Sequence, residues 1–165
     1  MIASVTVEAP AKLNLYLHVK GRRDDGYHVL DSLVCFLNVG DRLTLEKAEA
    51  YSLHTTGPFG AALAETPARQ NLVTRAIYAV AGRLGVAPHV AVTLQKNLPV
   101  ASGIGGGSSD AAAAMRGFLQ LWEKHIPQAE LNKIATTLGA DVPACLHPRP
   151  LYFGGIGDEI AEAPA

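Results

Sequence analysis

The sequence predicts one α+β domain in which helices pack on one side of a largely antiparallel or mixed sheet. The order of periodic segments supports this fold class, because strands come first, followed by helix, strand, helix, helix and a last strand. The length and composition agree with it. A chain of 165 residues with 48% hydrophobic and 18% charged residues can bury a substantial core without disulfides, and it lacks the polar composition of a disordered chain.

Alternating apolar and polar residues predict strands in the first third of the chain. The clearest alternation follows Pro10, with one set of positions apolar and the other polar: Leu13, Leu15, Leu17 and Val19 against Lys12, Asn14, Tyr16, His18 and Lys20. We expect the apolar set to face the core and the polar set to face a polar environment. The same signal predicts strands at residues 2–8, 29–36, 42–46 and 51–55.

Helix signals begin after a Pro- and Gly-containing connection at residues 57–70. Asn71 can cap a helix that Gly85 ends, because asparagine favours the N-cap and glycine the position after the last turn. A strand is predicted at residues 89–96. Two further helices are predicted from about Ser108 to Trp122 and at residues 130–138, and a last strand at residues 151–153.

Charge and cysteine usage exclude several classes of protein. Lys plus Arg number 14 and Asp plus Glu number 15, so a broad cationic surface for nucleic acid is not expected. The first residues have neither a basic start nor a long apolar stretch, which favours a cytoplasmic protein with no membrane partner. Cys35 and Cys145 lack metal-ligand or disulfide spacing, so we expect structural thiols and nominate no metal ligand.

The most informative segment is Pro99-Val-Ala-Ser-Gly-Ile-Gly-Gly-Gly-Ser-Ser-Asp-Ala-Ala, which lies between a predicted strand and a predicted helix. Its glycines allow close approach of the backbone to a ligand, and a helix starting at Ser108 or Ser109 offers free amides to an anion. We therefore predict a phosphate cradle. The alternative is a flexible loop with a serine N-cap. A P-loop is excluded because the chain has no Gly-Lys pair, and a Rossmann fingerprint because Ser stands at position 108.

This segment resembles the second motif of the GHMP kinase superfamily, which includes the galactokinases, homoserine kinases, mevalonate kinases and phosphomevalonate kinases. Four more motifs resemble one of its families, the 4-diphosphocytidyl-2-C-methyl-D-erythritol kinases: Ala9-Pro-Ala-Lys-Leu-Asn-Leu, Asp25-Gly-Tyr-His, Asn71-Leu-Val and Gly139-Ala-Asp-Val-Pro. Their order along the chain agrees with that family. The resemblance implies transfer of a phosphoryl group from ATP, with Mg²⁺, to a hydroxyl of a cytidine-diphosphate sugar alcohol in the methylerythritol phosphate route to isoprenoids.

The resemblance also implies roles for individual residues. Asp141 corresponds to the catalytic aspartate and Lys12 to the lysine that pairs with it. Asn14, Tyr27 and His28 correspond to substrate-binding residues, with the tyrosine stacked on the cytosine and the histidine at its edge. The residues implied for ATP binding are Asn71, Lys96, Pro99, Gly103, Gly105, Gly106, Gly107, Ser108 and Ser109. Without the family, Lys12 is equally well a surface lysine on a strand, and Asp141 a turn aspartate.

The kinases of this family continue into a second domain, so we expect residues 1–165 to be the N-terminal ATP-binding domain, with the C-terminal domain absent from this chain. An apolar face left without that domain would favour self-association. Two alternatives stay open. One is an inactive fragment that binds nucleotide without turnover. The other is an RNA-binding module, because the superfamily's first domain resembles a fold also found in ribosomal protein S5 and translation proteins.

Overall fold

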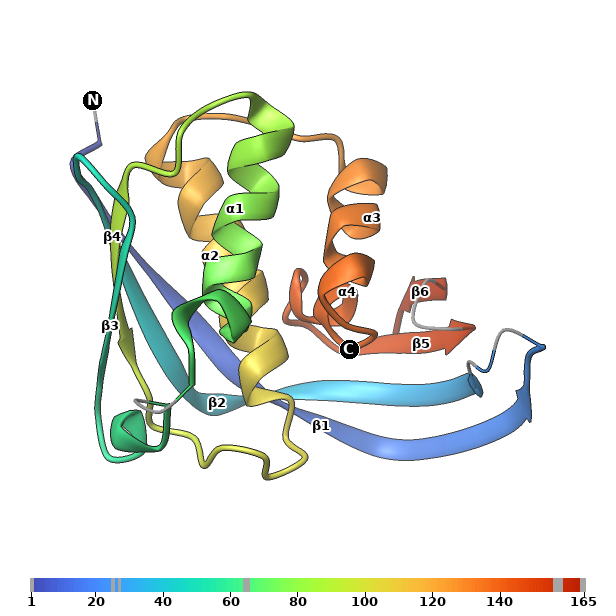
Figure 1. Cartoon of the computed structure of the whole chain (residues 1–165). Coiled ribbons are helices and arrows are strands. Elements are labelled where there is room, and N and C mark those ends of the chain that lie inside the picture. Colours follow the sequence, from blue (N-terminus) through green and yellow to red (C-terminus); the bar gives the residue numbers. More distant parts are fainter. Residues whose placement is uncertain (1, 25, 27, 64–65, 156–158, 164–165) are drawn as a thin grey trace.

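A mixed β-sheet forms one layer and the helices cover one of its faces, as the computed structural model shows for residues 2–24, 26, 28–63, 66–155 and 159–163 (Figure 1). This architecture confirms the predicted α+β class. The central elements are two long strands, β1 (Ser4–Arg22) and β2 (His28–Lys47), which pair antiparallel as a hairpin. One half of this hairpin lies under the helices, and the other half extends beyond them as an arm (Figure 1).

The second edge of β2 is shared between two other strands. Residues 42–47 of β2 pair antiparallel with β4 (Val90–Gln95), and residues 30–34 pair antiparallel with β5 (Leu151–Gly155). The sheet ends on one side with β3 (Ser52–Thr56), parallel to β4, and on the other with β6 (Glu159–Glu162), antiparallel to β5. β2 therefore joins the two halves of the sheet.

The helices that cover the sheet form the main hydrophobic core with it. They are α1 (Leu72–Leu84), α2 (Gly106–Leu121), α3 (Gln128–Leu138) and the short α4 (Val142–Cys145), preceded by the 3₁₀ turns η1 (Gly60–Leu63) and η2 (Ala68–Gln70). α2 is the central helix, and its buried side chains include Met115, Phe118 and Leu121. In the part of the chain that the structure describes, no helix is long and apolar enough to span a membrane.

The ends of α1 confirm the prediction made from local signals. The Asn71 side chain accepts a hydrogen bond from the Val73 amide at 2.9 Å, and Gly85 adopts a left-handed conformation with φ of 66°. Elsewhere the boundaries differ. The strands predicted separately at the N-terminus join into the continuous β1 and β2, and α4, β6 and the 3₁₀ turns were not predicted.

The expected core face of the first strand is wrong. Leu13, Leu15, Leu17 and Val19 are between 42% and 60% exposed. Before Leu15, Lys12 and Asn14 share the face of their partners Phe36 and Val34, which pack into the core, so Leu13 lies on the opposite face. Beyond it the register changes, because Asn14 pairs with Val34 whereas Tyr16 pairs with Leu33, which leaves Leu15 in an irregularity. Cross-strand partners share a face of the sheet and successive residues do not, so the alternation is reversed after Leu15.

The reversed alternation brings two apolar side chains to the helix side of the arm. Leu17 pairs with Ser32 and Val19 with Leu30, and these partners share the face of Val34, which packs against Ala144 of α4. No helix reaches over this part of the arm in Figure 1. Leu17 and Val19 are therefore exposed on the same side of the sheet as the helices, and we call this pair the arm patch.

One partly buried arginine links three elements of the fold. The Arg116 guanidinium on α2 donates to the carbonyl oxygens of Cys145 at 2.7 Å, Glu8 at 2.8 Å and Leu146 at 3.5 Å. Burial lowers the pKa of Arg116. These bonds hold α4 and β1 against α2, and so fix the positions of the residues that follow Glu8 and precede Cys145.

We predict that Arg116→Met destabilises the fold by about 2–3 kcal/mol, because backbone acceptors that Arg116 satisfies lose a charged donor. The free energy of unfolding in urea is the measurement. Arg83→Met is the matched control, since Arg83 forms an exposed ion pair with Glu130 and such pairs contribute about 0–1 kcal/mol. Equal losses in the two variants would contradict the linking role of Arg116.

Candidate active site

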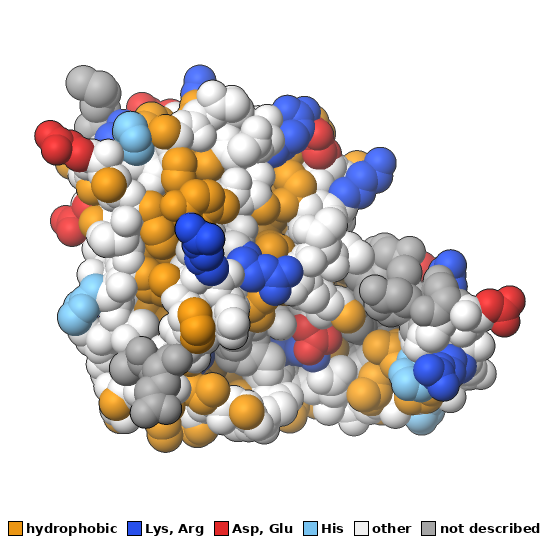
Figure 2. Space-filling view, viewed as in Figure 1, with side chains coloured by type: hydrophobic (Ala, Val, Ile, Leu, Met, Phe, Trp, Pro, Cys, Tyr) orange, Lys and Arg blue, Asp and Glu red, His pale blue; other side chains and the backbone are white. Residues whose placement is uncertain are grey.

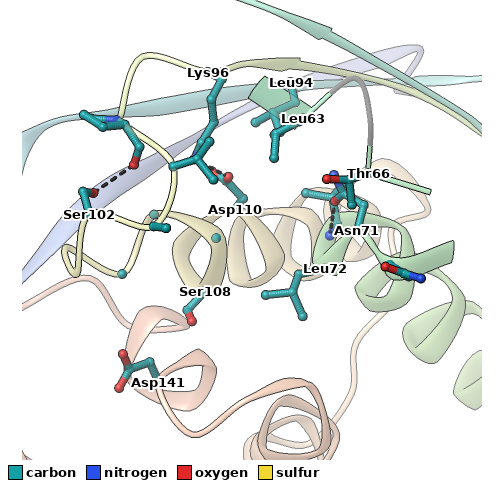
Figure 3. A pocket seen from close by; sticks show the side chains of 18 of the residues that line it. Leu63, Thr66, Asn71, Leu72, Leu94, Lys96, Ser102, Ser108, Asp110 and Asp141 are labelled. Atoms are coloured by element: carbon teal, nitrogen blue, oxygen red, sulfur yellow. Dashed lines mark hydrogen bonds and ion pairs between the residues drawn. The ribbon is translucent and has the colours of Figure 1, made fainter. Parts of the chain in front are cut away.

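A pocket of about 430 Å³ opens at the N-terminal end of α2. This volume lies in the range of roughly 300–1,000 Å³ that small-molecule sites occupy. Its walls come from the start of α1, the end of β4, the glycine-rich segment and the start of α4, and Asn71, Lys96, Ser108 and Asp141 lie around it (Figure 3). Segments far apart in the sequence thus meet at one helix terminus.

α2 begins at Gly106, two residues before the expected start, and its N-cap is Gly105. The N-cap is a glycine without a side-chain hydrogen bond, so the expected serine N-cap is wrong. The first helical hydrogen bond runs from the Ser109 amide to the Gly105 carbonyl at 2.9 Å. The amides of the first turn lack such partners, and with the helix dipole they provide a site for an anion.

Two glycines of this segment, Gly105 and Gly106, lie against two lysines behind it. A Cβ on Gly105, which has φ of 68°, would lie 3.1 Å from the Lys12 Cβ, and a Cβ on Gly106 would lie 3.1 Å from the Lys96 Nζ. The Lys12 amide also donates to the Ile104 carbonyl at 2.9 Å. The segment therefore lies directly on two buried lysine side chains, which place positive charge close to the free amides.

Lys12 and Asp141 meet at the edge of the pocket. The Lys12 Nζ lies 3.3 Å from the Asp141 Oδ2 and donates to the Asn14 Oδ1 at 2.8 Å. Asn14 in turn donates to the Ser32 hydroxyl at 2.7 Å. The Lys12 side chain is 3% exposed and that of Asp141 is 40% exposed, so the ammonium is held from behind and the carboxylate faces solvent.

A second charge cluster lies deeper, behind the start of α2. The Lys96 Nζ donates to the Asp41 Oδ2 at 2.5 Å and to the Asp110 Oδ2 at 2.8 Å. All three side chains are nearly fully buried. Sequence reasoning selected Lys96 and missed Asp41, because an acidic residue between two predicted strands resembles any turn residue. Only the sheet pairing brings Asp41 to the end of β4.

The other residues selected from the sequence fall into three groups. Pro99, Gly103, Gly107 and Ser108 line the pocket, as does the α1 cap Asn71. Ser109 does not line it, because its hydroxyl donates to the Pro10 carbonyl at 2.8 Å and the residue is buried. His28 is exposed at the turn end of the arm, outside the pocket, and Tyr27 lies outside the described residues.

Residues 71–149 match the family model described as GHMP kinases N terminal domain. This range includes the pocket-lining part of α1, the glycine-rich segment, α2 and Asp141. Likeness in fold extends to more distant proteins. A homoserine kinase from Cytophaga hutchinsonii superposes with a TM-score of 0.68 at 19% identity over 99% of this chain, which shows a shared fold alone.

Two curated relatives are much more similar. The 4-diphosphocytidyl-2-C-methyl-D-erythritol kinase of Paramagnetospirillum magneticum is 47% identical over 99% of this chain and 56% of the relative. That of Rhizobium etli is 53% identical over 97% of this chain and 54% of the relative. The chain thus spans about half the length of the relatives it matches.

A solved structure agrees with these matches. The crystal structure of a 4-(cytidine 5'-diphospho)-2C-methyl-D-erythritol kinase superposes with a TM-score of 0.76 at 36% identity, over 96% of this chain and 55% of that one. The chain therefore carries the N-terminal domain of the GHMP kinases, and over nearly its whole length it is a homologue of the 4-diphosphocytidyl-2-C-methyl-D-erythritol kinases.

Proposed function

We propose that this chain forms the ATP-binding part of a kinase that phosphorylates a hydroxyl of 4-diphosphocytidyl-2-C-methyl-D-erythritol, in the methylerythritol phosphate route to isoprenoids. The observation that carries the proposal is the Lys12–Asp141 pair beside the free amides of α2, in a chain homologous to such kinases. The substrate and the reaction come from the relatives, and the chemistry below comes from the residues of this chain.

ATP binds in the pocket with its phosphates on the first turn of α2. The amides there, together with the charge of Lys12 and Lys96, provide the electrostatic complement that a polyphosphate needs. The base and ribose would occupy the part of the pocket near Asn71 and Leu72. Apolar side chains such as Leu63 and Leu94 line that part and suit a flat aromatic ring.

Phosphoryl transfer requires positioning and charge stabilisation more than a strong base, because its transition state is loose. Asp141 is exposed enough to accept a hydrogen bond from the substrate hydroxyl and to orient its oxygen towards the terminal phosphate. Lys12 cannot turn away, since Asn14 and Asp141 both hold its ammonium group. It would therefore stabilise negative charge on the transferred group throughout the reaction.

The cytidine part of the substrate is assigned to Asn14, Tyr27 and His28, as the family pattern implies. Asn14 is held beside Lys12, and His28 lies on the arm that extends from this point. The arm would thus carry the nucleobase contacts away from the reacting hydroxyl.

Magnesium is expected to accompany ATP, but this chain offers little to hold the ion by itself. Among the described residues no three His, Cys, Asp or Glu side chains form a group that could bind a metal. Mg²⁺ in nucleotide sites keeps several waters and is held largely by substrate phosphates. We therefore assign no protein ligand and derive no step through the ion.

We propose in addition that two copies of this chain associate through the arm patch when nothing else covers it. Leu17 and Val19 are 53% and 60% exposed on one strand. We predict that light scattering shows a concentration-dependent dimer, and that Leu17→Lys with Val19→Lys abolishes it. Tyr78→Lys, at an exposed apolar residue on α1, is the control and should leave the dimer intact. A monomer at every concentration would contradict this proposal.

We predict that Asp141→Asn lowers the turnover number by orders of magnitude and changes the affinity for ATP little, because Asp141 acts on the acceptor hydroxyl. Turnover with ATP and the cytidine-diphosphate substrate is measured on this chain and on the longest product of its reading frame. Asp31→Asn, on the arm, is the control. Turnover of Asp141→Asn within a few-fold of the parent would remove the assignment, and ATP binding without turnover in every form would favour the inactive fragment.

We predict that Gly105→Ala weakens ADP binding about tenfold, whereas Gly103→Ala weakens it less. Both glycines have positive φ, 68° and 78°, so alanine costs about 1 kcal/mol of backbone strain at either position. Only at Gly105 does the added methyl group meet Lys12, which must shift the segment or the lysine. ADP titration followed by calorimetry is the measurement. Equal effects of the two variants would show that close approach to Lys12 is unimportant.

A further inference from the structure

The buried cluster behind α2 contains one carboxyl group more than its ammonium group can balance, and the proposed phosphoryl transfer does not explain this. It contains one ammonium, Lys96, and two carboxyl groups, Asp41 and Asp110, each at most 3% exposed. If both carboxyl groups were ionised, the cluster would hold a net charge of −1 next to a site for an anion. A negative charge at that place would oppose phosphate binding.

The two carboxyl groups differ in how well they are satisfied. Asp41 accepts the Asn97 and Leu98 amides at 2.6 and 2.8 Å on its Oδ1, and Lys96 on its Oδ2. Among the residues that the structure describes, Asp110 accepts a hydrogen bond only from Lys96, at 2.8 Å, and its Oδ1 is buried without a partner. Three donors stabilise the charged form of a carboxylate more than a single donor does, and an oxygen buried without a partner opposes ionisation. A proton in this cluster therefore belongs on Asp110.

Asp110 is also the carboxyl group of the cluster that lines the pocket. It projects from α2 between Lys96 and the first turn of the helix, as Figure 3 shows. A Cβ on Gly106 would lie 3.1 Å from the Lys96 Nζ and 3.7 Å from the Asp41 Oδ2, so the whole cluster lies directly behind the amides of the anion site. Its charge must act on any phosphate bound there.

The groups around Asp110 bring no second positive charge to it among the described residues. Lys96, at the end of β4, pairs with Asp110, and Asp41 of β2 is a second acid beside that lysine. Cys145 of α4 has a thiol whose pKa burial raises to about 12, so it stays neutral. The start of α1 contributes the uncharged Asn71 and Leu72 to the pocket. Asp141 and Lys12 lie across the pocket and pair with each other.

We propose that Asp110 couples nucleotide binding to a proton: the phosphates bind to the form of the pocket in which Asp110 is neutral, and binding takes up one proton from solvent at this carboxyl group. The proposal rests on the proposed nucleotide-binding function. When Asp110 is neutral, the positive charge of Lys96 balances the negative charge of Asp41, and the cluster as a whole carries no net charge. Asp110 thereby determines the affinity for nucleotide at a given pH.

The direction of the effect follows from the surroundings of Asp110. Burial raises its pKa to about 7, Lys96 acts to lower it and Asp41 acts to raise it. Bound phosphates add negative charge nearby and raise the pKa further. Nucleotide binding should therefore take up a proton at pH values above about 7, and the dissociation constant should increase by up to about tenfold per pH unit there.

Calorimetric titration of ADP at pH 8, in two buffers that differ in ionisation enthalpy, measures this proton. The phosphates of free ADP are ionised at that pH, since phosphate monoesters lose their second proton near pH 6. We expect the native chain to take up on the order of 0.5–1 proton for each ADP bound. Asp110→Asn should take up none, should bind ADP at least as tightly at pH 8, and should show little change in affinity between pH 7 and 9.

Asp31→Asn, whose carboxylate pairs with Lys20 on the arm, is the matched control and should behave as the native chain does. Equal proton uptake in the native chain and Asp110→Asn, or no uptake in the native chain, would overturn the proposal. If Asp110→Asn does not fold, the uptake by the native chain alone decides the matter. Absence of ADP binding by the native chain between pH 6 and 9 would instead overturn the proposed function itself.

Discussion

The pocket depends on two lysine ammonium groups that are buried behind the start of α2. Removing an ammonium from water costs several kcal/mol unless partners compensate it, so Lys12 and Lys96 must each be paired. Their partners come from separate elements, since Asn14 is on β1, Asp41 on β2, Asp110 on α2 and Asp141 at the start of α4. These four elements together satisfy both lysines, and their arrangement leaves the pocket open at the helix terminus.

The sheet supplies the geometry that this arrangement needs. β2 pairs with β1 on one edge and with β4 and then β5 on the other. It therefore carries both Asp41, which bonds Lys96, and Ser32, which bonds Asn14. The irregularity at Leu15 divides β1 into a part that lines the site and a part that forms the exposed arm. Before it, Lys12 and Asn14 face the helices, and after it Leu17 faces that side on a part of the strand that no helix covers.

Local signals in the sequence predicted what local physics determines. The Asn71 cap and the Gly85 end of α1 both depend on neighbours a few residues away. Strict alternation placed Lys12 and Asn14 on one face correctly, but it assigned the core side to Leu13, whereas Lys12 and Asn14 take the helix side. Beyond Leu15 the alternation itself reverses, because an irregularity leaves no mark in a period-two pattern.

Contacts between residues far apart in the sequence were harder to predict. The contact between Lys12 and Asp141 came from a family pattern and not from spacing, and Asp41 was missed because nothing near it in the sequence distinguishes it.

The two charged pairs on either side of the glycine-rich segment suit different tasks because they differ in exposure. Asp141 is 40% exposed and can meet a substrate directly, whereas Asp110 is 3% exposed and acts only through the field it adds to the pocket. A carboxylate that must touch an incoming hydroxyl has to remain hydrated and charged, and this favours the edge. A carboxyl group that adjusts the charge behind a phosphate has to be desolvated, because burial, with a like charge beside it, raises its pKa into the neutral range. On the proposed roles, the same residue type would serve both tasks, and its depth beneath the surface would determine which one.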